Sequence, residues 1–316
     1  MLFIDQIQAK DSELRPEFER LFALAIINQS HPGDLLLLLE NGTYNPEVLE
    51  YAGANLNPHV IGPGTAGWSY MTHYKFINMY RQRVYESTYV EYLAKIAELV
   101  AKQDWSTRDK LEEAEAISIQ LESLIYLKIW ESDFVIKRFY EFARILSGES
   151  FDWHFKVTPA TGSKKDPSTG TRQGIIREKV RDKVRSVSDV LYTSLFTAYK
   201  SQVRNSIAHS NFSIQSRYIH LNNFDPQDLG AQLKTVSFDD WVAMFHHTLA
   251  LYNGLIGLGN KILAHYEEVA AKQNNRIEVM VPDKSGTLQP IIIVYRPEFR
   301  DFRYWHPSDE ESSSSS

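Results

Sequence analysis

The sequence predicts a mainly α-helical protein whose central part is an antiparallel four-helix bundle. Apolar residues recur every three or four positions over four long segments, which is the spacing of a buried helix face. Turns and loops separate these segments, as expected for helices that run up and down in a bundle. An alternating pattern near the C-terminus predicts a small β-hairpin. The four helical segments are expected over residues 68–102, 107–146, 175–208 and 238–272.

Residues 1–67 precede the bundle and are expected to form an extension of helix and loop. An amphipathic helix is predicted over 12–29, where leucine and phenylalanine residues share one face. Five leucines at 35–39 follow Asp34, which we interpret as the N-cap of a short buried helix. Glycine, proline and asparagine are frequent over 41–67 and predict only short pieces of structure there.

The bundle domain, residues 68–272, is expected to contain two interruptions. Proline and glycine residues mark a loop or lid over 147–174, between the second and third helices. Between the third and fourth helices, alternation over 212–221 predicts a short strand.

The C-terminal part is predicted to add β structure and a tail. Two β-prone runs at 276–281 and 290–295 flank the turn sequence Asp283-Lys284-Ser285-Gly286, which is typical of a hairpin. They form an appendage over 273–306. Residues 307–316 are acidic and then polyserine, and we expect a disordered tail.

Composition excludes several classes of protein. Of the 316 residues, 43% are hydrophobic and 23% are charged, which is ordinary for a globular chain. The net charge of −6 argues against a surface that coats nucleic acid, although a local basic cleft is compatible with it. The absence of cysteine excludes disulfides, thiolate metal sites and a thiol nucleophile. We find no secretory signal pattern and no apolar run of membrane-spanning length. We therefore expect a cytoplasmic protein with no membrane partner.

Two other sequence patterns are better explained as structural features than as functional sites. Residues 62–67 spell GxGxxG, but a turn sequence precedes them and helices follow. A dinucleotide site would need flanking parallel strands, so we interpret 62–67 as a glycine-rich connector. His246 and His247 are adjacent on a helix and point about 100° apart, which does not suit one metal ion. They are interpreted as structural histidines, and we expect neither a metal nor a cofactor.

The best candidate site is the hexapeptide Arg204-Asn205-Ser206-Ile207-Ala208-His209, at the end of the third helix. Asn205 and His209 are four positions apart and share a helix face, and the long Arg204 side chain can reach the same space. A cation, an amide and an imidazole would then meet near a helix end. The alternative is that Arg204 and His209 only stabilise the helix C-terminus against its dipole. A looser Arg-to-His match, Arg300 to His306, does not lie at a helix end.

An Arg-Asn-x-x-x-His string that closes a helix of a four-helix bundle and is followed by Ser-x-Phe resembles the signature of HEPN domains. These all-α domains occur in bacterial toxins, phage-defence proteins and RNA-processing enzymes. The resemblance covers roughly 68–272. It implies a metal-independent endoribonuclease in which two protomers pair, so that two copies of the motif face one cleft. Arg204 and His209 would be the catalytic pair, and Asn205 the polar residue that often follows the arginine.

The side chains suit this chemistry. A ribose 2′-hydroxyl attacks the neighbouring phosphate when an acid or base lies within hydrogen-bond reach, and histidine titrates in the required range. Arg204 would bind the phosphate and stabilise its growing charge. The expected product is a 2′,3′-cyclic phosphate, and DNA would not be cut because it lacks the hydroxyl.

A basic stretch precedes the motif and favours RNA as the partner. We expect contacts with RNA from Arg177, Arg181, Arg185 and Lys200. The alternative is a solvated helix face that Glu178, Asp182 and Asp189 balance.

Other partners follow from the resemblance. We expect a homodimer and, since the chain has no nucleotidyltransferase signature, an antitoxin or regulatory protein encoded as a separate chain. The extension and the hairpin lie outside the common bundle and are expected to set the choice of partner or target. The alternative function is a non-catalytic helical interaction module of the same fold.

Overall fold

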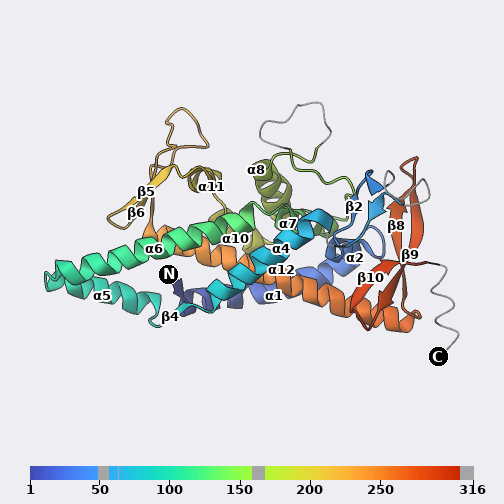
Figure 1. The fold of residues 1–316 in the computed structure, drawn as a ribbon, viewed down its shortest axis with the longest axis horizontal. Coiled ribbons are helices and arrows are strands. Elements are labelled where there is room, and N and C mark those ends of the chain that lie inside the picture. Colours follow the sequence, from blue (N-terminus) through green and yellow to red (C-terminus); the bar gives the residue numbers. More distant parts are fainter. Residues whose placement is uncertain (49–56, 63, 159–167, 307–316) are drawn as a thin grey trace. The chain divides into compact units, whose positions relative to one another are not determined.

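The computed structural model describes residues 1–48, 57–62, 64–158 and 168–306 (Figure 1). Helices dominate and the β-sheets have two or three strands each, which confirms the predicted mainly α class. The predicted disordered tail and the middle of the loop predicted over 147–174 lie outside the described residues.

Contacts along the chain divide the molecule into two compact units. Each unit combines three separate stretches of sequence. Unit 1 comprises residues 1–17, 70–135 and 184–254, and unit 2 comprises residues 18–69, 136–183 and 255–316.

The helices alternate with short strands and turns along the chain (Figure 1). They are α1 (Ile4–Asn28), α2 (Asp34–Leu39), α4 (Gly64–Arg81), α5 (Tyr89–Ala101), α6 (Trp105–Trp130), α7 (Asp133–Leu146), α8 (Arg172–Gly174), the π-helix η1 (Ile175–Arg181), α9 (Asp182–Val184), α10 (Asp189–Ala198), α11 (Ser201–Ala208) and α12 (Phe238–Lys272).

Within the described residues the strands form four small sheets. They are β1 (Leu2–Phe3) with β4 (Val84–Tyr85), β2 (Thr43–Tyr44) with β3 (His59–Val60), β5 (Phe212–Gln215) with β6 (Tyr218–Leu221) and β7 (Thr235–Ser237), and β8 (Arg276–Pro282) with β9 (Leu288–Arg296) and β10 (Asp301–Tyr304).

Three of the four long predicted helices are broken. The first predicted helix, over 68–102, is divided into two helices, α4 and α5. The strand β4 lies between them and pairs in parallel with β1. A capping box then starts α5, with the Thr88 hydroxyl accepting from Glu91 N and the Glu91 carboxylate accepting from Thr88 N. The second predicted helix ends at Trp130 and restarts at Asp133. The predicted helix over 238–272 is confirmed as α12.

The third predicted helix, over 175–208, is helical over most of its length but is not continuous. It consists of η1, α9, α10 and α11. Ser188 caps α10 by accepting a hydrogen bond from Leu191 N at 2.9 Å. Tyr199 and Lys200 then adopt extended backbone angles between α10 and α11. The apolar spacing continues through both breaks, so periodicity alone did not reveal them.

The extension contains the predicted short helix, with one correction. Asp34 is the first residue of α2 rather than its N-cap, and its carboxylate accepts a hydrogen bond from His31 N at 3.0 Å. The cap is Gly33, which has a φ of 100°. A β-carbon there would lie 2.8 Å from a Val279 methyl group, so only glycine fits this approach. The predicted helix over 12–29 is longer and begins at Ile4.

The C-terminal hairpin is confirmed, and the structure adds a third strand. β8 and β9 pair antiparallel with Val279 opposite Ile291, and β10 pairs antiparallel with β9. The strand predicted over 212–221 is instead a hairpin of β5 and β6. Its turn residues Ser216 and Arg217 both have positive φ angles, which are required by the tightest hairpin turns.

The core of unit 1 is arranged around a buried carboxylate. Glu122 of α6 accepts hydrogen bonds from Trp241 Nε1 at 2.7 Å, Tyr80 OH at 2.8 Å and Ser118 Oγ at 3.0 Å. It also forms an ion pair with the α-amino group of Met1. One polar group therefore joins the N-terminus, α4, α6 and α12.

His246 and His247 are buried in α12, in agreement with their interpretation as structural residues. His246 Nε2 accepts a hydrogen bond from Phe3 N at 3.1 Å, and its Nδ1 lies 2.7 Å from the carbonyl oxygen of Val242. These contacts define a neutral ring with the proton on Nδ1. No helix among the described residues is long and apolar enough to cross a bilayer.

Acidification is expected to destabilise the fold through His247. Burial, and then the neighbouring Lys10 and His246, lowers the pKa of His247 from 6.5 to about 4. Between these values the unfolded chain binds more protons than the folded one, so the free energy of unfolding falls as the pH falls. A shift of this size corresponds to about 3 kcal/mol.

His247→Gln removes this titration and is expected to flatten the pH dependence by that amount. The measurement is chemical denaturation at pH values above and below this interval. His265→Gln, at a half-buried position of the same helix, is the control. An equal pH dependence in wild type and His247→Gln would contradict the prediction.

Candidate functional site

The motif helix α11 is anchored in unit 1 by its buried face. Val203 and Ile207 are buried, and α11 packs against α6. The buried Gln202 donates to the carbonyl oxygen of Leu233 at 2.8 Å and accepts from its N–H at 2.9 Å. Ser206 is fully buried and donates to the carbonyl oxygen of Asn211. These contacts leave the face that carries Arg204 and Asn205 only half buried.

The Arg204 guanidinium is held by two partners. Its Nε forms an ion pair with the carboxylate of Glu131, the residue that caps the C-terminus of α6. Its Nη1 donates to Asn205 Oδ1 at 2.7 Å. The Arg204 side chain is 18% exposed and that of Glu131 is 31% exposed. The two contacts restrain the guanidinium while part of it remains accessible to solvent.

His209 occupies the C-cap of α11. Its N–H donates to the carbonyl oxygen of Asn205 at 3.1 Å, and its side chain is exposed. Within the described residues, the imidazole has no polar partner. The structure thus brings Arg204 and Asn205 into direct contact and leaves His209 at the open end of the same helix. Of the three side chains predicted to meet, those of Arg204 and Asn205 are in contact, and the His209 imidazole makes no hydrogen bond or ion pair with either of them.

The residues predicted to bind RNA fall into both units. Arg177 and Arg181 lie on η1 in unit 2, where Arg181 pairs with Asp182 at 2.7 Å. Arg185 and Lys200 lie in unit 1 with the motif. Contact of Arg177 and Arg181 with the same RNA as the motif stays a prediction.

Arg185 and Lys200 belong to a surface row that includes two aromatic rings. The Arg185 guanidinium lies 5.0 Å from the centre of the Tyr192 ring, and Lys200 Nζ lies 3.7 Å from that of Phe196. The two rings are 6.2 Å apart and inclined by 29°. Phe196 is 46% exposed. We call these four residues the cation–aromatic row; it ends next to α11.

Sequence reasoning missed Glu131, Tyr192 and Phe196. The two aromatic residues are four positions apart on α10, between two predicted basic contacts, and that spacing was available as a signal. Glu131 had no local signal, because it lies far from Arg204 in the chain and meets it only through the packing of α11 on α6.

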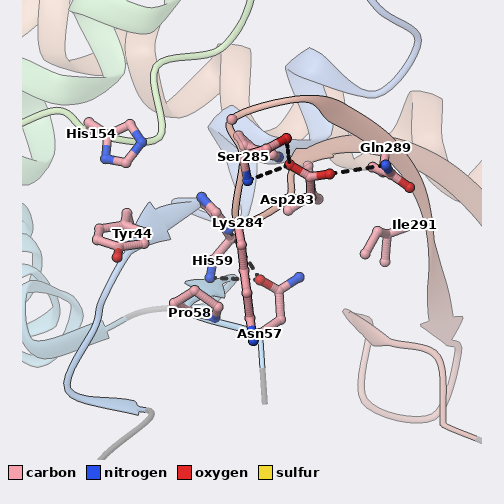
Figure 2. Close-up of a pocket in the computed structure, with 13 residues that line it drawn as sticks. Tyr44, Asn57, Pro58, His59, His154, Asp283, Lys284, Ser285, Gln289 and Ile291 are labelled. Carbon is pink, nitrogen blue, oxygen red and sulfur yellow. Dashed lines mark hydrogen bonds between the residues drawn. The ribbon is translucent and has the colours of Figure 1, made fainter. Parts of the chain in front are cut away.

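The structure also contains a cavity in unit 2 that the sequence did not indicate (Figure 2). It measures about 750 Å³ and lies beside the β2–β3 pair and the turn of the β8–β9 hairpin. Figure 2 shows Tyr44 and His154 on one side of this space, with Asp283, Ser285 and Gln289 on another. A neighbouring cavity of about 760 Å³ shares Tyr44 and His154 with it.

The GxGxxG stretch does not have the surroundings of a dinucleotide site. The preceding strand β3 has two residues and pairs antiparallel with β2. A Rossmann site requires a parallel sheet on both sides of the glycine-rich turn. Gly62 has a φ of 118° and comes before α4, as expected for a connector. Pro63 lies outside the described residues.

Comparisons with protein-family models, with curated proteins and with solved structures found no match for this chain.

Proposed function

We propose that this chain is a metal-independent endoribonuclease of the HEPN type, with Arg204, Asn205 and His209 as its site. The observation that carries the proposal is the arrangement on α11. An exposed imidazole lies one turn beyond an arginine that Glu131 and Asn205 hold in place. A titratable group and a fixed cation at one open helix end are what phosphodiester cleavage requires.

The proposed reaction breaks one bond and forms one. The ribose 2′-oxygen bonds to the adjacent phosphorus, and its proton passes to a base. The bond from phosphorus to the 5′-oxygen breaks, and that oxygen takes a proton from an acid. Arg204 stabilises the negative charge on the phosphate oxygens during the exchange. The products are a 2′,3′-cyclic phosphate and a 5′-hydroxyl end.

This reaction supports a homodimer as the active form. It needs one group that accepts a proton and one that donates a proton, and each motif contains one imidazole. Two protomers that face each other across the RNA would supply both. The proposal places the enzyme in the cytoplasm, with an antitoxin or regulatory protein as a separate partner.

Glu131 is assigned a positioning role. Its carboxylate contacts the Nε edge of Arg204, so it would determine which nitrogen atoms remain available to a phosphate. Asn205 restrains the guanidinium through Nη1.

The cation–aromatic row supports single-stranded RNA as the substrate. Bases stack on exposed aromatic faces, while Arg185 and Lys200 would pair with phosphates.

Phe196→Ala is expected to weaken RNA binding by about 1–3 kcal/mol, and Lys200→Ala is expected to lower the salt dependence of binding by about one phosphate contact. Filter binding or fluorescence anisotropy over a salt series measures both. Leu229→Ala, an exposed apolar position outside the row, is the control. An unchanged affinity for both variants would contradict a role for the row.

The test of the proposed function is cleavage of a defined RNA by the purified chain in EDTA. Cleavage with 2′,3′-cyclic phosphate ends, no cleavage of the matching DNA, and protection of an RNA with a single 2′-deoxy nucleotide at the cut position are expected. Cleavage that requires a divalent metal ion, or cleavage of DNA, would show that the mechanism is wrong.

A helical interaction module is the second candidate, and one observation favours it. The ion pair between Arg204 and Glu131 joins α11 to α6 and would stabilise a fold without any catalytic role. In that case Arg204→Ala lowers the melting temperature and the wild-type chain does not cut RNA.

A further inference from the structure

We propose that the cavity in unit 2 is a binding site for a small nucleotide, with the base against Tyr44 and His154 and the phosphate near Lys284. This site goes beyond the proposed ribonuclease function and does not depend on it. The cavity's volume of about 750 Å³ lies within the range of small-molecule sites.

Aromatic rings form one wall of the cavity. The Tyr44 ring centre lies 4.8 Å from that of His154 and 5.1 Å from that of His59. The Trp153 ring packs edge-on against His59 at 5.2 Å. Tyr44 is 38% exposed, so part of its ring is open to a ligand. Such rings favour a planar, heteroaromatic ligand.

The backbone holds this wall in place without a ligand. Tyr44 N donates to the carbonyl oxygen of Trp153 at 2.8 Å, and Tyr304 OH donates to the carbonyl oxygen of His59 at 2.6 Å. Residues from β2, β3, β10 and the chain around 153 therefore fix the rings relative to one another. A rigid, preformed site loses less entropy on binding.

His59 supplies a hydrogen-bond acceptor that has no partner. Its ring is 4% exposed, and its Nδ1 lies 3.1 Å from Asn57 Oδ1, which accepts only. The proton is therefore on Nδ1, and Nε2 carries a lone pair. Within the described residues Nε2 is buried and makes no hydrogen bond. Burial, and then His154, lowers the pKa of His59, which keeps the ring neutral. An amino or imino N–H of a nucleobase is a suitable donor.

The hairpin turn supplies a cation on the other side. Asp283 accepts from Ser285 N at 2.7 Å and from Thr287 N at 3.0 Å, and Gln289 Nε2 donates to its second oxygen at 3.2 Å. These bonds hold the turn and satisfy the carboxylate. Lys284, between Asp283 and Ser285, is exposed and lines the cavity. The neighbouring cavity adds Lys156 and Lys179. Planar rings beside cations suit a base that carries phosphate.

The test is isothermal titration of the full-length chain with ATP, GTP, CTP and UTP. The corresponding nucleosides and inorganic triphosphate separate the contributions of the base and the phosphate. At least one nucleotide is expected to bind with a micromolar dissociation constant. Tyr44→Ala is expected to weaken it at least about tenfold, which is the effect of losing one stacked base. Lys284→Ala is expected to weaken nucleotide binding and to leave nucleoside binding unchanged.

Tyr218→Ala is the matched control, since Tyr218 is 46% exposed, lies next to a histidine ring and belongs to unit 1. His154→Ala is the second test variant, because His154 is exposed and its removal is expected to leave the fold intact. The proposal is overturned if no nucleotide binds at a concentration about a thousandfold above the expected micromolar dissociation constant. It is also overturned if Tyr44→Ala and His154→Ala bind as the control does, or if inorganic triphosphate binds as tightly as the nucleotide. Binding is read without RNA, so this result is independent of the ribonuclease assay.

Discussion

Replacing Arg204 or His209 with alanine is expected to lower the rate of RNA cleavage at least about 100-fold. Without His209 the 2′-hydroxyl has no group on α11 to exchange a proton with. Without Arg204 the charge that grows on the phosphate has no fixed cation. Single-turnover cleavage of a defined RNA in EDTA, with the enzyme in excess, measures the chemical step.

Further variants separate catalysis from folding. Arg204→Lys keeps the charge but loses the planar guanidinium. Compared with Arg204→Ala, it is therefore expected to recover more of the stability than of the cleavage rate. Glu131→Gln is expected to lower cleavage less than Arg204→Ala does, because the guanidinium remains but is less firmly oriented. Arg300→Ala is the matched control: Arg300 also pairs with a glutamate, Glu267, at 3.0 Å, and it lies in unit 2. Melting temperatures are recorded for every variant. Wild-type cleavage rates in both Arg204→Ala and His209→Ala would exclude α11 as the active site.

Replacing Glu122 with alanine is expected to lower the free energy of unfolding by about 3–5 kcal/mol. The substitution leaves Trp241 Nε1 and Tyr80 OH buried without their acceptor, and it leaves the Met1 ammonium without its counter-charge. Glu122→Gln retains an acceptor oxygen and is expected to cost less. Urea denaturation measures both. The exposed Glu98, which pairs with Lys102 on α5, is the control, and Glu98→Ala is expected to leave stability unchanged.

The contribution of the Glu122 carboxylate to stability is expected to decrease as the pH falls. Burial alone would raise the pKa of Glu122, but the Met1 ammonium, Trp241 and Tyr80 lower it below its usual value of 4.5. The ionised carboxylate therefore stabilises the fold above pH 4.5, and this contribution is lost as the pH falls through the depressed pKa. The difference in stability between wild type and Glu122→Gln is expected to shrink on acidification. A difference that grows at low pH would contradict this assignment.

Local patterns predicted the elements that depend on local interactions. The apolar spacing over 238–272 corresponds to one continuous helix, α12, and the turn sequence around Asp283 corresponds to the β8–β9 hairpin. The same spacing failed over 68–102, because pairing between β1 and β4 interrupts the helix. That pairing joins residues far apart in the chain, and no periodicity within 68–102 encodes it.

The sequence by itself determined the class of the fold and the candidate motif. The hydrogen bonds of one short helix set the relation of Arg204, Asn205 and His209, and these bonds depend on residues close in the chain. Only the tertiary structure placed Glu131 against Arg204, divided the predicted basic residues between two units, and gathered Tyr44, His59 and His154 around a cavity. The physical reason is the same in each case. Packing brings together side chains from distant segments, and their contacts leave no repeat or spacing in the amino-acid sequence.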